Sequence, residues 1–172
     1  MATAIVHILR AGQTISAISR ASNTVSVTLS ASYPNNNLKV GQSIVINTGT
    51  GGTASFNGTF TIASVASQTS FTYTQIDSDE TGTLGTSPVA GGDYSLMSDW
   101  EAGEQRDLVA LDETETLECY NDWPSGLVDS VNINGWTTDA TRFVTVKAAD
   151  GESAQGKIDA GFYIYKNYGA FK

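Results

Sequence analysis

Alternation of apolar and polar residues runs through the first half of the chain and predicts short β-strands. Residues 24–29 (TVSVTL) alternate strictly, which is the two-residue period of a strand with one buried face. The same pattern recurs in three further segments, residues 42–47, 59–65 and 70–75. Turn residues separate these segments, including Asn57–Gly58, a dipeptide typical of tight hairpins. Residues 21–76 are therefore predicted to form a small antiparallel β-barrel or sandwich domain.

The second half mixes one helical segment with further strand-like segments. Leu96 and Trp100 fall on one helical face of residues 96–105, where Ser98 and Glu101 have the spacing of a capping box. Strand-like patterns occupy residues 108–120 (as a strand, or as a strand after a broken helix), 131–135, 142–148 and 162–165. The whole chain is thus predicted to be mainly β, with a second β-rich domain that contains one short helix.

These patterns divide the chain into four parts. The small β domain at residues 21–76 and the β-rich domain at residues 94–172 are joined by residues 77–93, which are rich in Gly, Ser and Thr and predict a linker or long loop. Residues 1–20 precede them as an N-terminal arm or strand. This arm either pairs within its own domain or adds a strand to a neighbouring molecule. Its apolar run is the candidate capsid or subunit interface: Ile5, Val6, His7, Ile8, Leu9 and Arg10.

Charge is distributed very unevenly along the sequence. The net charge is −9, yet all 18 acidic residues follow Ile76. Residues 1–76 carry three charged side chains, all basic: Arg10, Arg20 and Lys39. An isoelectric point near 4.3 argues against a nucleic-acid partner, because such binding depends on Lys and Arg neutralising phosphates. The first half is instead suited to contact an acidic protein surface.

Membrane insertion and export are also not expected. The chain contains no apolar run of the length that spans a bilayer. The N-terminal apolar stretch is short, and Arg10 follows it rather than preceding it, which is unlike a secretory signal. We therefore expect a protein made in the cytoplasm without a signal peptide. Its single cysteine, Cys119, allows no internal disulfide.

The search for catalytic or metal chemistry leaves weak candidates. Asp77 and Asp79 resemble the start of a calcium loop, but Pro88 occupies the position that needs a bidentate Glu, so a looser calcium site is what remains. A nucleophile pair of His7 and Cys119 has no supporting motif. The acidic run between residues 99 and 118 offers many carboxylate pairs for a small glycan hydrolase, but none is specific. We predict no catalytic residue, no bound metal and no cofactor.

Aromatic residues of the acidic half form a candidate contact site. Tyr120 and Trp123 flank a turn, and Trp136 follows a second one. Aromatic side chains near turns can bind sugar rings, but they also serve as core or interface anchors. Both interpretations stay open for Tyr120, Trp123 and Trp136.

Two stretches resemble known families. Residues 24–75, with FNGTFTIASV followed by TSFTYTQ, resemble small β modules of tailed-bacteriophage structural proteins. Residues 94–157, with YSLMSDWEAGEQRDLVA, ECYNDWPSGL and INGWTTDATRFVTV, resemble a module of phage and environmental surface proteins that often precedes a parallel β-helix. Because the sequence ends with FYIYKNYGAFK, we expect no long β-helix and no depolymerising cleft.

The resemblance implies a virion structural protein rather than an enzyme. A capsid decoration (cement) protein, which binds the outer capsid surface and stabilises the shell, fits the size of the chain. Its expected partners are the major capsid protein and further copies of itself, with a trimer favoured. The alternatives are a tail or fibre module that binds host glycan and, with less weight, a small glycan hydrolase.

Overall fold

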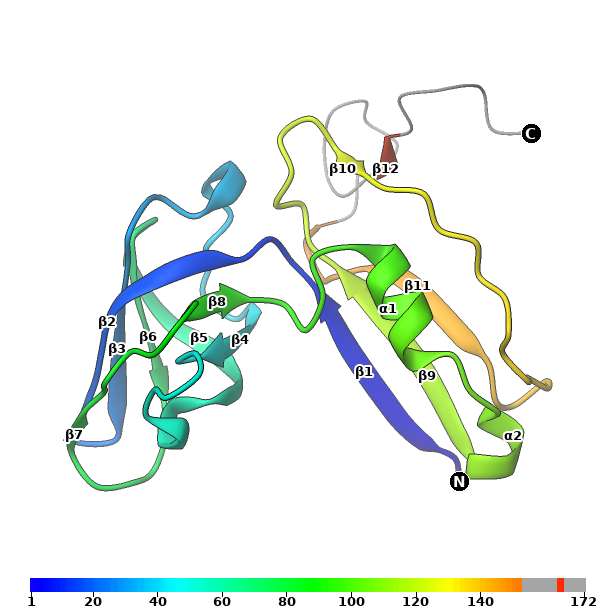
Figure 1. Cartoon of the computed structure of the whole chain (residues 1–172), viewed down its shortest axis with the longest axis horizontal. Helices are drawn as coiled ribbons and strands as arrows, with labels where there is room; N and C mark the ends of the chain where they lie inside the picture. The colour runs from blue at the N-terminus through cyan, green and yellow to red at the C-terminus, as the bar shows by residue number, and fades with distance from the viewer. Residues whose placement is uncertain (153–163, 166–172) are drawn as a thin grey trace. The chain divides into compact units, whose positions relative to one another are not determined.

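The computed structural model describes residues 1–152 and 164–165, which belong to two compact units (Figure 1). Residues Ala11–Gly92 form one unit, called the barrel unit below. Met1–Arg10 and the chain from Asp93 onward form the other, called the parallel-sheet unit. Strands account for 43% of the structure and helices for 12%, which confirms the predicted mainly β fold.

The barrel unit is a closed, six-stranded antiparallel barrel. Its strands and short 3-10 helices are β2 (Gln13–Ala21), β3 (Thr24–Leu29), η1 (Pro34–Asn36), β4 (Ser43–Asn47), η2 (Ala54–Phe56), β5 (Gly58–Ser67), β6 (Ser70–Thr74), β7 (Glu80–Thr81) and β8 (Val89–Gly91). The strand order is β3-β6-β5-β4-β8-β2, and β2 also pairs with β3, which closes the barrel. The short strand β7 pairs with β2 next to this ring.

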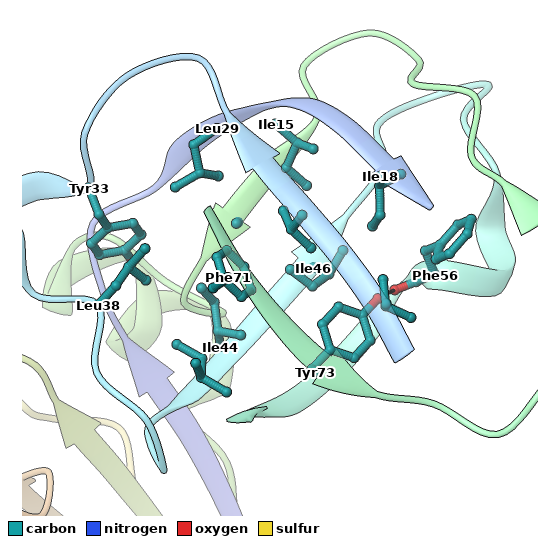
Figure 2. Packing of buried hydrophobic residues seen from close by; sticks show 14 residues of the cluster. Ile15, Ile18, Leu29, Tyr33, Leu38, Ile44, Ile46, Phe56, Phe71 and Tyr73 are labelled. Atoms are coloured by element: carbon teal, nitrogen blue, oxygen red, sulfur yellow. Dashed lines mark hydrogen bonds between the residues drawn. The ribbon is translucent and has the colours of Figure 1, made fainter. Parts of the chain in front are cut away.

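The barrel closes around the apolar residues that alternate along its strands. On β3, Val25, Val27 and Leu29 are buried, while the polar residues between them are exposed. All three belong to the same buried cluster as Phe71 and Tyr73 of β6, and Figure 2 shows Leu29, Phe71 and Tyr73 within it. Burying the apolar face of every strand in one shared core is the main source of stability for such a domain.

One mouth of the barrel holds a buried charge. The Arg20 side chain is 2% exposed and lies over the Phe56 ring, 4.9 Å from its centroid. Its nitrogens donate to the Ser78 carbonyl at 2.7 Å, the Gln75 side chain at 2.6 Å and the Glu80 carboxylate at 3.2 Å. The segment after β6 is therefore fastened to the barrel by a fully engaged guanidinium group.

The parallel-sheet unit joins the chain start to its second half. Its elements are β1 (Thr3–Leu9), α1 (Met97–Glu104), α2 (Leu108–Leu111), β9 (Glu113–Cys119), β10 (Leu127–Val128), β11 (Val144–Ala148) and β12 (Ile164–Tyr165). β9 lies between β1 and β11, and both pairings are parallel. β10 and β12 form a second parallel pair. Of the predicted last strand at residues 162–165, residues 162–163 lie outside the described residues.

The predicted helix is present, but it begins differently from the expected capping box. Helix α1 follows Leu96, whose own side chain makes no capping hydrogen bond. The Ser98 backbone N–H is bound instead by the Asp129 carboxylate, at 3.0 Å. Helix α2 begins after Asp107, whose side chain accepts a hydrogen bond from Ala110 N–H. Residues 108–120 thus form a short helix followed by a strand, one of the two arrangements expected for them.

The division into units differs from the one predicted along the sequence. The expected arm at residues 1–20 consists of two strands, β1 in the parallel-sheet unit and β2 in the barrel. The expected linker at residues 77–93 contributes β7 and β8 to the barrel. The barrel unit is therefore inserted between β1 and the rest of the parallel-sheet unit. Sequence-local patterns do not reveal such an insertion, because the β1–β9 pairing joins residues about a hundred positions apart.

Candidate functional site

The N-terminal segment that was predicted to contact a partner is mostly inside its own unit. It forms β1, in which Val6 is 51% exposed and Ile5 and His7 are half-buried. Ile8 and Leu9 are buried, and Leu9 belongs to the core of the parallel-sheet unit. The cause is the parallel pairing with β9, which sets Leu9 opposite Cys119. Ile8 and Leu9 are therefore not available as a contact surface.

Arg10 is also buried, in an ion pair that the sequence did not indicate. Its side chain is 0% exposed, and its Nε and a terminal nitrogen donate to the two Asp122 carboxylate oxygens at 3.1 and 3.3 Å. The guanidinium lies 4.3 Å from the centroid of the Tyr120 ring. A guanidinium group can form two hydrogen bonds with one carboxylate and stack on an aromatic ring at the same time, which a Lys ammonium group cannot do. Arg10 thus has a structural role and is not part of a surface contact.

The sheet also carries a compact polar network around Glu115. This carboxylate is 0% exposed and accepts hydrogen bonds from Trp100 Nε1 at 3.0 Å and from Arg106 at 2.9 Å. His7 Nδ1 lies 2.7 Å from the same carboxylate, and His7 Nε2 lies 3.3 Å from Glu104. Every polar group of the network has a partner, as buried polar groups require.

Two side chains near this network have raised pKa values. Burial raises the pKa of Tyr94 to about 12, and the hydrogen bond from its hydroxyl to Glu104 acts in the same direction. Burial likewise raises the pKa of the Cys119 thiol to about 12, helped by the nearby Glu118 carboxylate. Cys119 is therefore a neutral thiol at ordinary pH, which makes it a poor nucleophile.

The three aromatic residues proposed as one contact site lie in different surroundings. Tyr120 is 4% exposed beneath Arg10. Trp123 is half-buried and packs against the core of the parallel-sheet unit. Trp136 lies beside Trp100, with ring centroids 5.7 Å apart, and Arg106 lies 5.7 Å from its ring centroid. Trp136 also lines an open surface pocket.

That pocket has a volume of about 330 Å³ and is open to solvent. Its lining has four apolar residues and two uncharged polar ones: Ile133, Trp136, Phe143, Val144, Asn134 and Thr138. Ile133 is 47% exposed and Phe143 is 48% exposed, an unusual exposure for large apolar side chains that sit side by side. Trp136 Nε1 is buried and has no hydrogen-bond partner among the described residues. The pocket can hold a small neutral ligand that offers both an apolar face and polar groups.

Sequence reasoning identified Trp136 but missed the residues around it. Phe143 directly precedes β11 in the alternating stretch of residues 142–148, and both Phe143 and Val144 line the pocket. Ile133 was assigned to a strand, whereas the structure has irregular backbone there. Its exposure could not be inferred from the pattern, because a predicted strand buries its isoleucine side chains.

The candidate metal positions are used for other contacts. The Asp77 carboxylate lies 3.5 Å from Arg20, and Asp79 accepts a hydrogen bond from Ser22 N–H at 2.8 Å. Within residues 1–152, no group of three or more His, Cys, Asp or Glu side chains has the geometry to hold a metal ion. A second open pocket, of about 450 Å³, lies near Asp112 and Arg142, which form an ion pair at 2.8 Å.

Comparisons with known proteins add no relative to this picture. No family model, no curated protein and no solved structure matches the chain. Among the helices of the described residues, none combines the length and apolar character needed to cross a bilayer.

Proposed function

We propose that this chain is a non-enzymatic virion structural protein that binds the outer surface of a capsid as a symmetric oligomer, with a trimer favoured. The major capsid protein is its partner in this proposal. The resemblance of residues 24–75 to phage β modules suggests a virion protein, and one observation about the barrel surface supports a role in binding another protein. That observation is a charge-free, hydroxyl-covered sheet face.

The face, called the hydroxyl face below, runs across β2, β3, β6 and β5. Two rows of cross-strand neighbours make it up: Ser19, Ser26, Thr72 and Ser64 in one row, and Ala17, Thr28, Ser70 and Ser67 in the other. Ser64 and Thr72 are hydrogen-bonded to each other at 2.7 Å. Another protein can cover such a face without burying a charge, provided that the hydroxyl groups keep hydrogen-bond partners.

Soluble domains normally protect their exposed surfaces from association with interspersed charged side chains. These four strands contain one charged residue, Arg20, and it is buried in the barrel mouth. A surface without such protection supports a role in which another protein covers it. Since the charges of Arg10 and Arg20 are buried, attachment through this face depends on shape and hydrogen bonds. The expectation that positive charge directs the first half toward an acidic shell loses its basis.

The test is occupancy on purified particles, measured as copies of the chain per capsid subunit. Ser26→Lys and Thr28→Lys place charges in the middle of the hydroxyl face, at exposed positions that the fold tolerates. Thr59→Lys is the matched control, because Thr59 is an exposed β5 residue that lies opposite Val45 of β4 and outside the two rows. Loss of occupancy in the two face variants alone supports the proposal. Unchanged occupancy, or no association of the wild-type chain, would contradict it.

A second candidate function has its own observation, the pocket at Trp136. Two large side chains, Trp136 and Phe143, supply the kind of surface on which a sugar ring stacks, and Asn134 and Thr138 supply neutral hydrogen-bonding groups. These features support a module that binds a neutral host glycan. A negatively charged sugar is disfavoured, because the lining has no cationic side chain and Arg106 is already held by carboxylates.

Tryptophan fluorescence during titration with a panel of neutral di- and trisaccharides tests this candidate. Ile133→Ala and Phe143→Ala should weaken any binding, while Ile76→Ala, an isoleucine 87% exposed on the other unit, is the matched control. Saturable binding that is lost in the two pocket variants supports a glycan module. Binding unaffected by them, or no binding to any member of the panel, counts against it.

A further inference from the structure

The chain contains two Asn-Gly dipeptides, Asn57–Gly58 and Asn134–Gly135, and the structure holds them differently. In such a pair the glycine nitrogen can attack the asparagine side chain, because glycine has no side chain to obstruct the approach. We propose that Asn134 is a self-modification site, at which the folded protein converts the amide to aspartate and isoaspartate. Asn57 is protected from the same reaction.

The reaction needs water and no other reagent. The Gly135 backbone nitrogen loses its proton and attacks Cγ of Asn134. The N–Cγ bond forms, the Cγ–Nδ2 bond breaks, and ammonia leaves with the proton, so a five-membered succinimide results. Water then adds to one of the two ring carbonyls and opens the ring. The product is aspartate or isoaspartate, and either one carries a new ionised carboxylate at neutral pH.

The surroundings of Asn134 leave both reacting groups accessible. Asn134 and Gly135 are exposed, and Gly135 has a φ of +74° in a turn. Among the described residues, none accepts a hydrogen bond from Gly135 N–H. The Asn134 side chain makes one long contact, from Nδ2 to the Asn132 carbonyl at 3.2 Å. The segment nonetheless stays in place, because Asn134 N–H donates to the buried Glu101 carboxylate at 2.9 Å.

Asn57 has the opposite surroundings. Its Oδ1 accepts hydrogen bonds from both the backbone N–H and the hydroxyl of Thr48, at 2.7 and 2.9 Å. Thr48 is 0% exposed, so these bonds are costly to break. Gly58 lies in β5 opposite Ile46 of β4. Moving Cγ of Asn57 toward the Gly58 nitrogen would therefore disrupt both the Thr48 contacts and the strand pairing.

The new carboxylate has a defined local effect. It lies at the pocket lined by Asn134 and Trp136, and close to Glu101, which binds the Asn134 backbone. The new carboxylate and the Glu101 carboxylate repel each other because both are negatively charged. Isoaspartate also adds a methylene group to the backbone of the turn. The conversion itself stands independently of any ligand. If the pocket binds a neutral sugar, as in the second candidate function, the conversion should also weaken that binding, and this expectation rests on the glycan proposal.

The test is peptide mapping of the intact folded protein during prolonged incubation at mildly alkaline pH, with detection of isoaspartate and of the mass gain from amide to acid. We expect Asn134 to convert at least about tenfold faster than Asn57, a difference of about 1.4 kcal/mol in barrier, because Asn57 must first lose its two hydrogen bonds to Thr48. In the urea-unfolded chain both sites should convert at similar rates. Asn134→Gln, which cannot form the five-membered ring readily, should abolish the fast mass gain.

Two results would overturn the proposal. One is equal conversion of Asn57 and Asn134 in the folded protein, which would show that the fold protects neither site. The other is an Asn134 that stays an amide in the folded chain, whatever happens in urea. Neither result bears on capsid association, so the outcome is separate from that of the proposed function.

Discussion

Replacing Glu115 by glutamine is the sharpest test of how the parallel-sheet unit is held together. The side chain is fully buried and accepts hydrogen bonds from Trp100 and Arg106, with His7 beside it. Glutamine has nearly the same size as glutamate but carries no charge. Its amide NH2 group is a hydrogen-bond donor, and it would face Trp100, Arg106 and His7, which already supply donors to this position. Arg106 then loses the partner that is most shielded from water.

The size of the stability loss depends on the ion pairs that Arg106 retains in the variant. Removing one partner of a fully buried ion pair costs about 3–5 kcal/mol. Arg106, however, is 22% exposed and retains Glu113 at 2.9 Å and Glu104 at 3.3 Å. A single hydrogen bond to a charged group contributes about 1.5–3 kcal/mol. We therefore expect Glu115→Gln to lower the free energy of unfolding by about 2 kcal/mol.

Urea unfolding followed by tryptophan fluorescence measures this directly. All three tryptophans, Trp100, Trp123 and Trp136, lie in the parallel-sheet unit, so the signal reports that unit and not the barrel. Glu118→Gln is the matched control on the same strand, because Glu118 pairs with the exposed Lys147 and surface pairs contribute little. Equal midpoint shifts for the two variants, or a loss below about 0.5 kcal/mol for Glu115→Gln, would refute the reasoning.

Three further predictions address other parts of the molecule. Cys119 should resist thiol reagents at about pH 8 in the folded protein and react after unfolding; rapid labelling of the native chain would contradict its burial. Trp100→Phe should destabilise the protein by about 1–3 kcal/mol more than Trp136→Phe in urea unfolding. The first change removes one of the donors to the buried Glu115 carboxylate, whereas Trp136 Nε1 has no partner among the described residues. Replacing Ala11–Gly92 by a few glycines should leave the parallel-sheet unit folded, because the chain leaves and re-enters this unit at neighbouring positions. The shortened protein should keep the native tryptophan emission spectrum and a cooperative urea unfolding transition. An emission spectrum typical of unfolded protein would refute this.

The strands of the barrel could be predicted where alternation was strict and not where it was interrupted. Residues 24–29 match β3 in full. β2 was predicted only as part of an N-terminal arm or strand and was not recognised as a separate strand of the barrel. Its register shifts between Ile15 and Ala17, so its core residues Ile15 and Ile18 are three positions apart and break the two-residue period.

A different cause hid β8. It contains Gly91, at which an added Cβ would lie 2.9 Å from the Gly12 backbone. The glycines there permit a close approach of two strands, although in sequence they look like a linker. A glycine-rich segment can therefore be either a flexible linker or a strand that lies close to its neighbour, and the local sequence does not distinguish the two.

The candidate site was less predictable than the fold, because contacts between distant residues form it. Arg10 and Asp122 are paired across 112 positions, and His7 and Glu115 across 108. No local pattern marks either pair. Trp136 could be identified because an aromatic residue after a glycine turn is conspicuous, but its neighbour Phe143 is brought to the pocket by the path of the chain before β11.

The uneven charge along the sequence has a structural origin, and this bears on recognition. Arg20 in the barrel mouth lies close to Asp77 and Glu80, so the first acids of the sequence belong to the barrel and partner its buried base. Arg10 is partnered in the same way by Asp122. Of the bases in the first half, Lys39 is the one whose residue is exposed. The barrel unit, with two bases and three acids, is therefore nearly neutral rather than basic, and most of the net negative charge belongs to the parallel-sheet unit. Attachment through the hydroxyl face should accordingly persist at high salt, because screening weakens interactions between exposed charges and leaves buried pairs and neutral hydrogen bonds largely unaffected.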